Sequence, residues 1–212
     1  MKGILLINLG SPNDLSSSSI KNFLTEFLSD DLVVDYPKFI QQPLVRGIIV
    51  PFRYKNTQSA YKEVWTENGS PLILTTRNLA QELSNETSLP VEIAMRYQNP
   101  SIREGLGALA NRGCTKIKVV PLYPHFAIST TLTTKLKVEE ELTKMDMDIE
   151  VEYIDSFFDS NLYIQALSSI IKENMDPESD LLLFSYHGIP KRHLKKATKE
   201  RNHSEELCID SK

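Results

Sequence analysis

The sequence predicts an α/β protein built on doubly wound parallel sheets. Several short runs rich in β-branched residues and leucine are largely apolar rather than alternating. Such runs are typical of strands that helices cover on both faces. Segments with the apolar spacing of amphipathic helices lie between these runs, and this alternation of strands and helices favours a parallel sheet.

The predicted elements follow one another along most of the chain. The strands are residues 4–9, 91–95, 117–122, 149–154 and 181–185, and the helices are residues 15–28, 71–87, 102–112, 131–145 and 162–175. Asp14 and the serines after it are N-cap candidates for the first helix, and Gly113 follows the third helix as a C-terminal stop. Residues 36–54 combine large apolar side chains with three prolines, which predicts an apolar excursion outside the sheet.

Composition narrows the class of partners. The chain has 24 basic and 28 acidic residues and a net charge of -4, so it lacks the basic surface of a nucleic-acid-binding protein. Cys114 and Cys208 lie far apart without a CxxC pair, which favours a reduced, cytoplasmic protein. No apolar stretch approaches the roughly 20 residues of a membrane-spanning helix, although contact with a membrane surface stays open.

Several familiar motifs are absent or lie in the wrong context. Residues 105–110 match the dinucleotide-binding pattern GxGxxA, but they fall inside a predicted helix instead of a turn after a strand. The nucleophile elbow of hydrolases is missing, and Ser185 with His187 is a weakly supported catalytic pair. His193, His203 and Cys208 fit no familiar zinc spacing, so we expect them to be solvated surface residues.

His187 lies just past the carboxyl end of predicted strand 181–185, where Gly188 and Pro190 turn the chain. Ligands of open α/β sheets bind at this edge, so His187 is a candidate catalytic residue. Its position alone is equally compatible with a histidine that caps a loop. Three more strand ends, residues 8–12, 96–100 and 121–131, bring aromatic, cationic and hydroxyl side chains to the same edge. Together they predict a binding cleft.

These segments resemble the ferrochelatase family, and the resemblance covers nearly the whole chain. Its pieces are LINLGSP at residues 6–12, NFLTEFL at 22–28, WTENGSPL at 65–72, RYQNP at 96–100, PLYPHFAISTT at 121–131 and FSYHGIP at 184–190. The resemblance implies a lyase that inserts ferrous iron into protoporphyrin IX to form protohaem, the last step of haem biosynthesis. It also implies a chelatase-like fold of two similar Rossmann-like domains, with residues 1–150 as the first and residues 151–212 as the incomplete second.

The resemblance also assigns roles to individual residues. His187 matches the histidine of the family pattern S-x-H-G/S-x-P, which accepts pyrrole protons or delivers the metal. Neutral imidazole suits both roles near pH 7, because its ordinary pKa is about 6.5. Residues 36–54 resemble the lip over the porphyrin slot. By the same analogy, the residues expected to bind the porphyrin are Leu9, Arg46, Arg53, Arg96, Tyr123, Ser129 and Thr130, with Arg46 or Arg53 pairing with propionates.

Three departures from the family pattern refine this expectation. Leu9 stands where relatives that use coproporphyrin carry tyrosine, so it favours protoporphyrin. Ile128 replaces a cluster-binding cysteine of some relatives, so we assign no iron–sulfur cluster and no permanent cofactor, and iron enters as a substrate only. The family's acidic catalytic residue in its carboxyl-terminal domain has no counterpart before Lys212.

Two alternatives therefore stay open beside a ferrochelatase. One is a short chelatase that completes its cleft as a homodimer, and the other is a chain that binds porphyrin without turnover. Because strand 181–185 would lie at an exposed edge or face, we also expect dimerisation or poor solubility.

Overall fold

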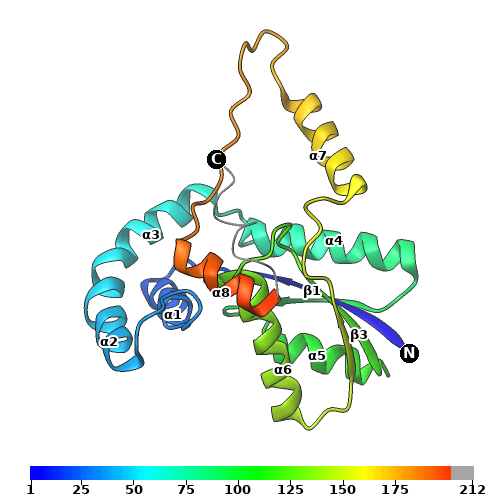
Figure 1. Ribbon diagram of the computed structural model, residues 1–212, viewed down its shortest axis with the longest axis horizontal. Helices are drawn as coiled ribbons and strands as arrows, with labels where there is room; N and C mark the ends of the chain where they lie inside the picture. Colours follow the sequence, from blue (N-terminus) through cyan, green and yellow to red (C-terminus); the bar gives the residue numbers. More distant parts are fainter. Residues whose placement is uncertain (202–212) are drawn as a thin grey trace.

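The computed structural model describes residues 1–201, with side chains through residue 197, so His203 and Cys208 lie outside the described residues. The described strands form a four-stranded parallel sheet in the order β2-β1-β3-β4 (Figure 1). These strands are β1 Lys2–Asn8, β2 Val91–Met95, β3 Lys116–Pro121 and β4 Glu150–Tyr153. In the central strand, Leu6 pairs with Ile93 on one side and Val120 on the other.

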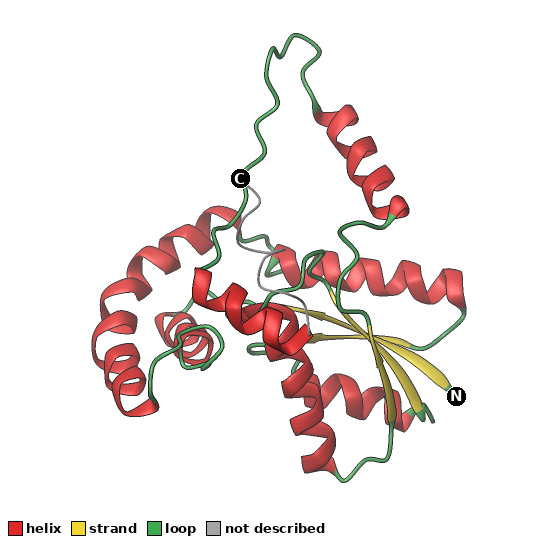
Figure 2. Ribbon diagram, in the orientation of Figure 1, coloured by secondary structure: helices red, strands yellow, loops and turns green. Residues whose placement is uncertain are grey.

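Helices cover both faces of this sheet, as the apolar runs predict (Figure 2). Leu5 and Ile7 of β1 pack toward α5 Ile102–Asn111 and α6 Thr133–Met145. Their neighbours Ile4 and Leu6 face the opposite side, where α4 Pro71–Thr87 lies. Since successive side chains of a strand point to opposite faces, a strand buried on both sides must be apolar at consecutive positions.

The helix ends and one helical glycine follow ordinary local chemistry. Ser16 caps α1 Ser17–Leu28 by accepting a hydrogen bond from the Ser19 backbone N–H. Gly113 ends α5 with a φ of 78°, which confirms the predicted stop. A Cβ on Gly105 would lie 2.7 Å from Cδ1 of Leu5, so this glycine lets α5 pack closely on the sheet. The close packing of α5 on the sheet thus accounts for Gly105 of the GxGxxA pattern, and a bound dinucleotide is not needed to explain it.

The predicted excursion lies outside the sheet, as expected, but it is helical. It comprises α2 Lys38–Pro43, the π-helix η1 Leu44–Ile49 and α3 Val50–Val64, which follow one another without a break. Pro43 and Pro51 flank η1, where the chain changes its hydrogen-bond spacing. The inner side of this segment packs on α1 through Val45 and Val50, and residues 36–54 are called the lip below.

The chain after β4 contains the predicted helix at residues 162–175 but not the predicted strand at residues 181–185. It contains α7 Asn161–Asn174 and α8 Lys191–Arg201, and Figure 1 shows α7 projecting away from the sheet. The prediction of a strand at residues 181–185 is wrong, because no described strand lies beside this segment to pair with its N–H and C=O groups. Leu181 and Leu183 are 79% and 83% exposed. The division at residue 150 stays a prediction.

Among the described helices, none is both long and apolar enough to span a bilayer.

Candidate functional site

A cavity of about 630 Å³ lies beyond the carboxyl ends of β1 and β3. Cavities of this volume commonly hold organic ligands. Its lining residues come from four separate stretches of the chain. They are Leu9, Phe27, Val33, His125, Phe126, Ala127, Ser129, Thr130, Tyr186, His187, Gly188, Ile189, Pro190 and His193.

The wall around Leu9 depends on a close approach between the loops after β1 and β2. The Tyr97 backbone N–H donates to the Leu9 carbonyl at 3.0 Å, and the Leu9 N–H donates to Oδ1 of Asn8 at 2.8 Å. Gly10 has a φ of 104°, and a Cβ there would lie 2.0 Å from the Tyr97 carbonyl oxygen. Only glycine permits this approach, and it fixes the backbone of Leu9 at the cavity.

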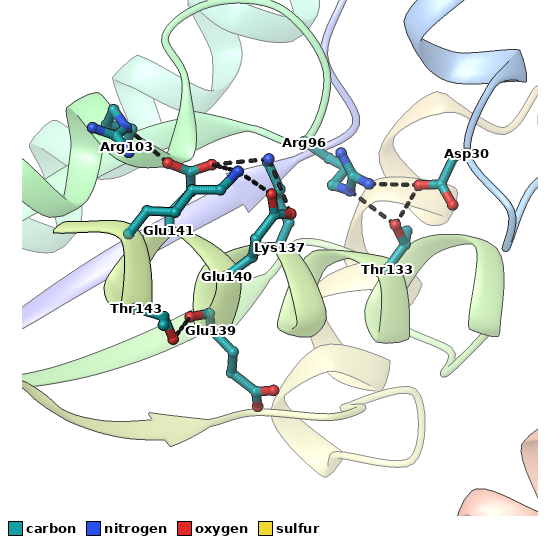
Figure 3. A network of polar contacts seen from close by, with 10 residues as sticks. Asp30, Arg96, Arg103, Thr133, Lys137, Glu139, Glu140, Glu141 and Thr143 are labelled. Atoms are coloured by element: carbon teal, nitrogen blue, oxygen red, sulfur yellow. Dashed lines mark hydrogen bonds and ion pairs between the residues drawn. The ribbon is translucent and has the colours of Figure 1, made fainter. Parts of the chain in front are cut away.

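A buried polar network holds the parts of the site together behind this wall (Figure 3). Oδ2 of Asp30 accepts hydrogen bonds from the Arg96 guanidinium, the Thr133 hydroxyl and, at 2.8 Å, the Tyr97 hydroxyl. Burial raises the pKa of the Tyr97 phenol, so the hydroxyl keeps the proton it donates. The network joins the end of α1, the loop after β2 and the start of α6.

Arg96 is therefore engaged inside the protein. Its side chain is 13% exposed, its Nε donates to Thr133 at 2.9 Å, and it lines a smaller neighbouring cavity together with Glu26 and Glu141. It is not among the residues that line the main cavity. The structure places Arg96 near the site in a position that supports the scaffold.

The hydroxyl groups of the site come from the π-helix η2 Ile128–Leu132, which leads into α6. Ser129 and Thr130 line the cavity, as expected from the sequence. Ile128 is 2% exposed and Thr131 is fully buried, so both point into the protein. The π-helix thus separates two cavity-facing residues from two that anchor it.

Three histidines line the cavity, and each has a different environment. His187, exposed and flanked by Tyr186 and Gly188, reaches the cavity although the strand predicted before it is absent. His125, which was not among the expected site residues, stacks on Phe158 with ring centroids 5.0 Å apart. Its place in the loop directly after a strand is the sequence signal that could have identified it.

His193 lies at the cavity and not on the solvated surface. It was expected on the solvated surface, but it is 4% exposed and lines the cavity from the first turn of α8. Neither ring nitrogen has a hydrogen-bond partner within the described residues. Burial, followed by the charge of Arg192, lowers the pKa of His193. The helical spacing of His193, Leu194 and Ala197 is the signal that could have placed it on a packed face.

Other expected site residues lie away from the cavity lining. Tyr123 is largely buried, its hydroxyl has no partner among the described residues, and burial raises its pKa. Arg46 and Arg53 are exposed on the lip, and Nε of Arg46 donates to Oε1 of Gln42 at 2.9 Å. The structure thus groups Leu9, Ser129, Thr130 and His187, and leaves the roles of the arginines and the tyrosine as predictions.

The fold and cavity define a class: a parallel α/β protein with a largely apolar, histidine-containing ligand site at the carboxyl edge of its sheet. Among the side chains that the structure describes, those of residues 1–197, no cluster of three or more His, Cys, Asp or Glu could hold a metal ion. The chain belongs to the ferrochelatase family, since the model of that family matches residues 1–208.

Individual relatives agree with this assignment. The chain is 41% identical over 205 residues to a ferrochelatase of Opitutus terrae, which covers 95% of this chain and 59% of the relative. It is 40% identical over 195 residues to a ferrochelatase of Photobacterium profundum, covering 90% of the chain and 60% of the relative. A ferrochelatase of Vibrio parahaemolyticus is 34% identical over 194 residues, which cover 91% of the chain. The matches span 59% to 61% of these relatives' lengths.

Proposed function

We propose that this protein inserts ferrous iron into protoporphyrin IX and that the cavity at the carboxyl edge of the sheet binds the porphyrin. The single observation that carries the proposal is the position of His187. In a chain of the ferrochelatase family, it brings an exposed imidazole to an apolar cavity large enough for an organic ligand.

The walls of the cavity suit a flat, largely apolar macrocycle. Apolar side chains of Leu9, Phe27, Val33, Phe126 and Ile189 line the cavity. The hydroxyls of Ser129 and Thr130 add the few polar groups that orient a ligand in such a site.

In the proposed reaction, His187 acts at the pyrrole nitrogens. Insertion of ferrous iron replaces two N–H bonds of the porphyrin with bonds to the metal, and iron keeps its oxidation state. A neutral imidazole can accept one of these protons or bind the incoming ion as it loses water. Because His187 is exposed, it can pass a proton on to solvent.

The lip supports two further parts of the proposal. Arg46 and Arg53 are exposed cations near large apolar residues, so they are available to pair with propionates. Phe39 and Phe52 are 78% and 77% exposed, which supports contact with a membrane surface from which an apolar porphyrin could arrive. We place the protein in the cytoplasm as part of this proposal, on the spacing of its two cysteines.

A second candidate is a chelatase that completes its cleft as a homodimer. The exposed apolar surface of α7 and of residues 181–189 favours it, because surface of this kind is usually covered by a partner. In the third candidate, the chain binds porphyrin without turnover.

Anaerobic metalation of protoporphyrin IX, followed by absorbance with ferrous iron or zinc, tests these candidates. Turnover that rises linearly with protein concentration supports the first, whereas specific activity that rises with concentration supports the dimer. Porphyrin binding without turnover supports the third.

His187→Ala is expected to reduce metalation by at least about 100-fold while porphyrin binding persists, because the imidazole acts at the reacting nitrogens. Lys191→Gln is a suitable control, since Lys191 is exposed on α8 and lies outside the cavity lining. Full turnover of His187→Ala removes His187 from the mechanism.

A further inference from the structure

Metalation releases two protons from the porphyrin, and His187 can accept only one of them at a time. A free-base porphyrin carries two pyrrole N–H protons, and both must leave when one ferrous ion binds. One imidazole accepts one proton at a time. The cavity contains two further histidines, and their environments decide which of them could accept the second proton.

His193 has the environment that fits this role. Its side chain is buried against the cavity, and both ring nitrogens lack partners among the described side chains, which extend through residue 197. Buried polar atoms in native proteins are normally hydrogen-bonded, so an orphaned imidazole at a ligand site indicates a partner that the protein alone does not supply. His125 differs, because it is exposed and its ring stacks on Phe158.

The position of His193 is fixed by contacts on both sides of it. Its backbone N–H donates to the Pro190 carbonyl at 2.8 Å, which starts the helix. One turn later, Nζ of Lys196 binds Oδ2 of Asp35 at 2.7 Å, and Nε of Arg192 lies 3.7 Å from the same oxygen. These ion pairs hold the first turns of α8 against the loop after α1, so the imidazole is positioned without using its own polar atoms.

The charges around His193 favour its neutral form. Arg192 and Lys196 on α8 disfavour a second positive charge, and Asp35 on the facing loop opposes them. Burial is the largest influence, so the pKa of His193 lies below its ordinary value of 6.5. The other titratable groups of the cavity lining are His125, Tyr186 and His187, and none of them hydrogen-bonds to the ring nitrogens of His193. At neutral pH, His193 therefore has a free lone pair.

We propose that His193 is a second proton acceptor for porphyrin metalation, an inference that rests on the proposed function. As the four porphyrin nitrogens bind the ferrous ion in place of its water ligands, the two N–H bonds break, and one pyrrole proton passes to His187 and the other to His193. Both protons then leave to water, iron stays ferrous, and the imidazoles return to their neutral forms. His193 is catalytic in this scheme because it contacts the reacting porphyrin.

The kinetic test uses His193→Gln, which keeps a polar side chain of similar size but no basic nitrogen. We expect kcat for metalation to fall about 100-fold, with the dissociation constant for protoporphyrin, from fluorescence quenching, within about twofold of the parent value. The matched control is Lys191→Gln, which removes an exposed cation of α8 that lies outside the cavity lining and makes none of the ion pairs that position His193, and it is expected to retain kcat. Unchanged kcat in His193→Gln, or equal losses in the two variants, overturns the proposal.

A second measurement does not depend on turnover and so separates this inference from the proposed function. Protein with ¹⁵N-labelled histidines is titrated with free-base protoporphyrin and with its palladium(II) complex, which has the same shape but no pyrrole N–H and takes no axial ligand. The His193 ring signals, assigned by their loss in His193→Gln, are expected to shift more with the free base. Equal or absent shifts overturn the role of His193 even if metalation occurs. Absence of metalation, by contrast, contradicts the proposed function and leaves the shifts to be judged independently.

Discussion

In residues 1–153, apolar side chains are buried between the sheet and helices on both of its faces, whereas in residues 154–201 large apolar side chains face solvent along α7 and residues 181–189. The two regions have similar apolar patterns in the sequence but different pairing partners in the fold. Residues 154–158 stay in contact with β3 and the loop after it, and after α7 the segment around His187 and the first turn of α8 return to the first region at the cavity. The buried core is therefore formed within residues 1–153, whereas the cavity is also lined by residues that follow α7.

The largest expected effect tests the network that holds the first region together. Asp30→Ala should lower the free energy of unfolding by about 3–5 kcal/mol, because it leaves the Arg96 guanidinium largely buried without its carboxylate. Urea unfolding followed by the fluorescence of Trp65, the single tryptophan, measures this change.

Asp31→Ala is the matched control. Asp31 is adjacent in sequence, but its side chain is 53% exposed and lies 3.4 Å from Lys38. Its removal should change the free energy of unfolding by no more than about 0.5 kcal/mol. Similar losses in both variants would mean that the Asp30 network contributes no more than an exposed ion pair.

The sequence allowed much of the first region to be predicted, because its signals are local. Consecutive apolar residues in β1, the capping serine of α1 and the glycine stop of α5 each depend on a few neighbouring residues. The Asp30 network could not be predicted in this way. Asp30 lies 66 residues before Arg96 and 103 before Thr133, so no periodic pattern connects these residues.

In the candidate site too, local signals could be predicted and contacts between distant residues could not. Leu9, Ser129, Thr130 and His187 reach the cavity as expected, since residues after parallel strands meet at one edge. The prediction of a strand at residues 181–185 was wrong because an apolar run forms a strand only beside a partner strand. The sequence of the run does not specify such a partner. The prediction that His193 lies on the surface was wrong because α8 is held in place by ion pairs with Asp35. Asp35 is distant in the sequence, so no local pattern indicates this contact.

An intermediate effect is expected at the contact between α5 and α6. Oε2 of Glu141 accepts from Nε of Arg103 at 2.8 Å, and Oε1 lies 2.9 Å from Nζ of Lys137 (Figure 3). Glu141→Gln should lower the free energy of unfolding at pH 7 by about 1 kcal/mol, since both cations are partly exposed and their attraction is screened.

This loss should depend on pH with a definite sign. Lys137, and then Arg103, hold the pKa of the Glu141 carboxyl below its ordinary value of 4.5. Its stabilisation is therefore present above 4.5 and disappears as the pH falls through the lower pKa of the folded state. Urea unfolding over a pH series should show the difference between Glu141→Gln and the parent shrinking in acid. Glu139→Gln, on the exposed side of the same helix, is the matched control and should change the free energy of unfolding at pH 7 by no more than about 0.5 kcal/mol.

The smallest effect is expected in the second region. Leu183 is 83% exposed, so Leu183→Ala should change the free energy of unfolding by no more than about 0.5 kcal/mol, measured by urea unfolding. The same substitution at the fully buried Leu106 of α5 should lower the free energy of unfolding by about 2–5 kcal/mol, because it leaves a cavity in the core.

A loss above about 1 kcal/mol at Leu183 would contradict its exposure and mean that the segment packs against another surface in solution. If that loss grows with protein concentration, and sedimentation shows a dimer that Leu183→Ala weakens, the covering surface is a second copy of the chain. The contrast between the two regions would then describe the single chain and not the assembly in solution.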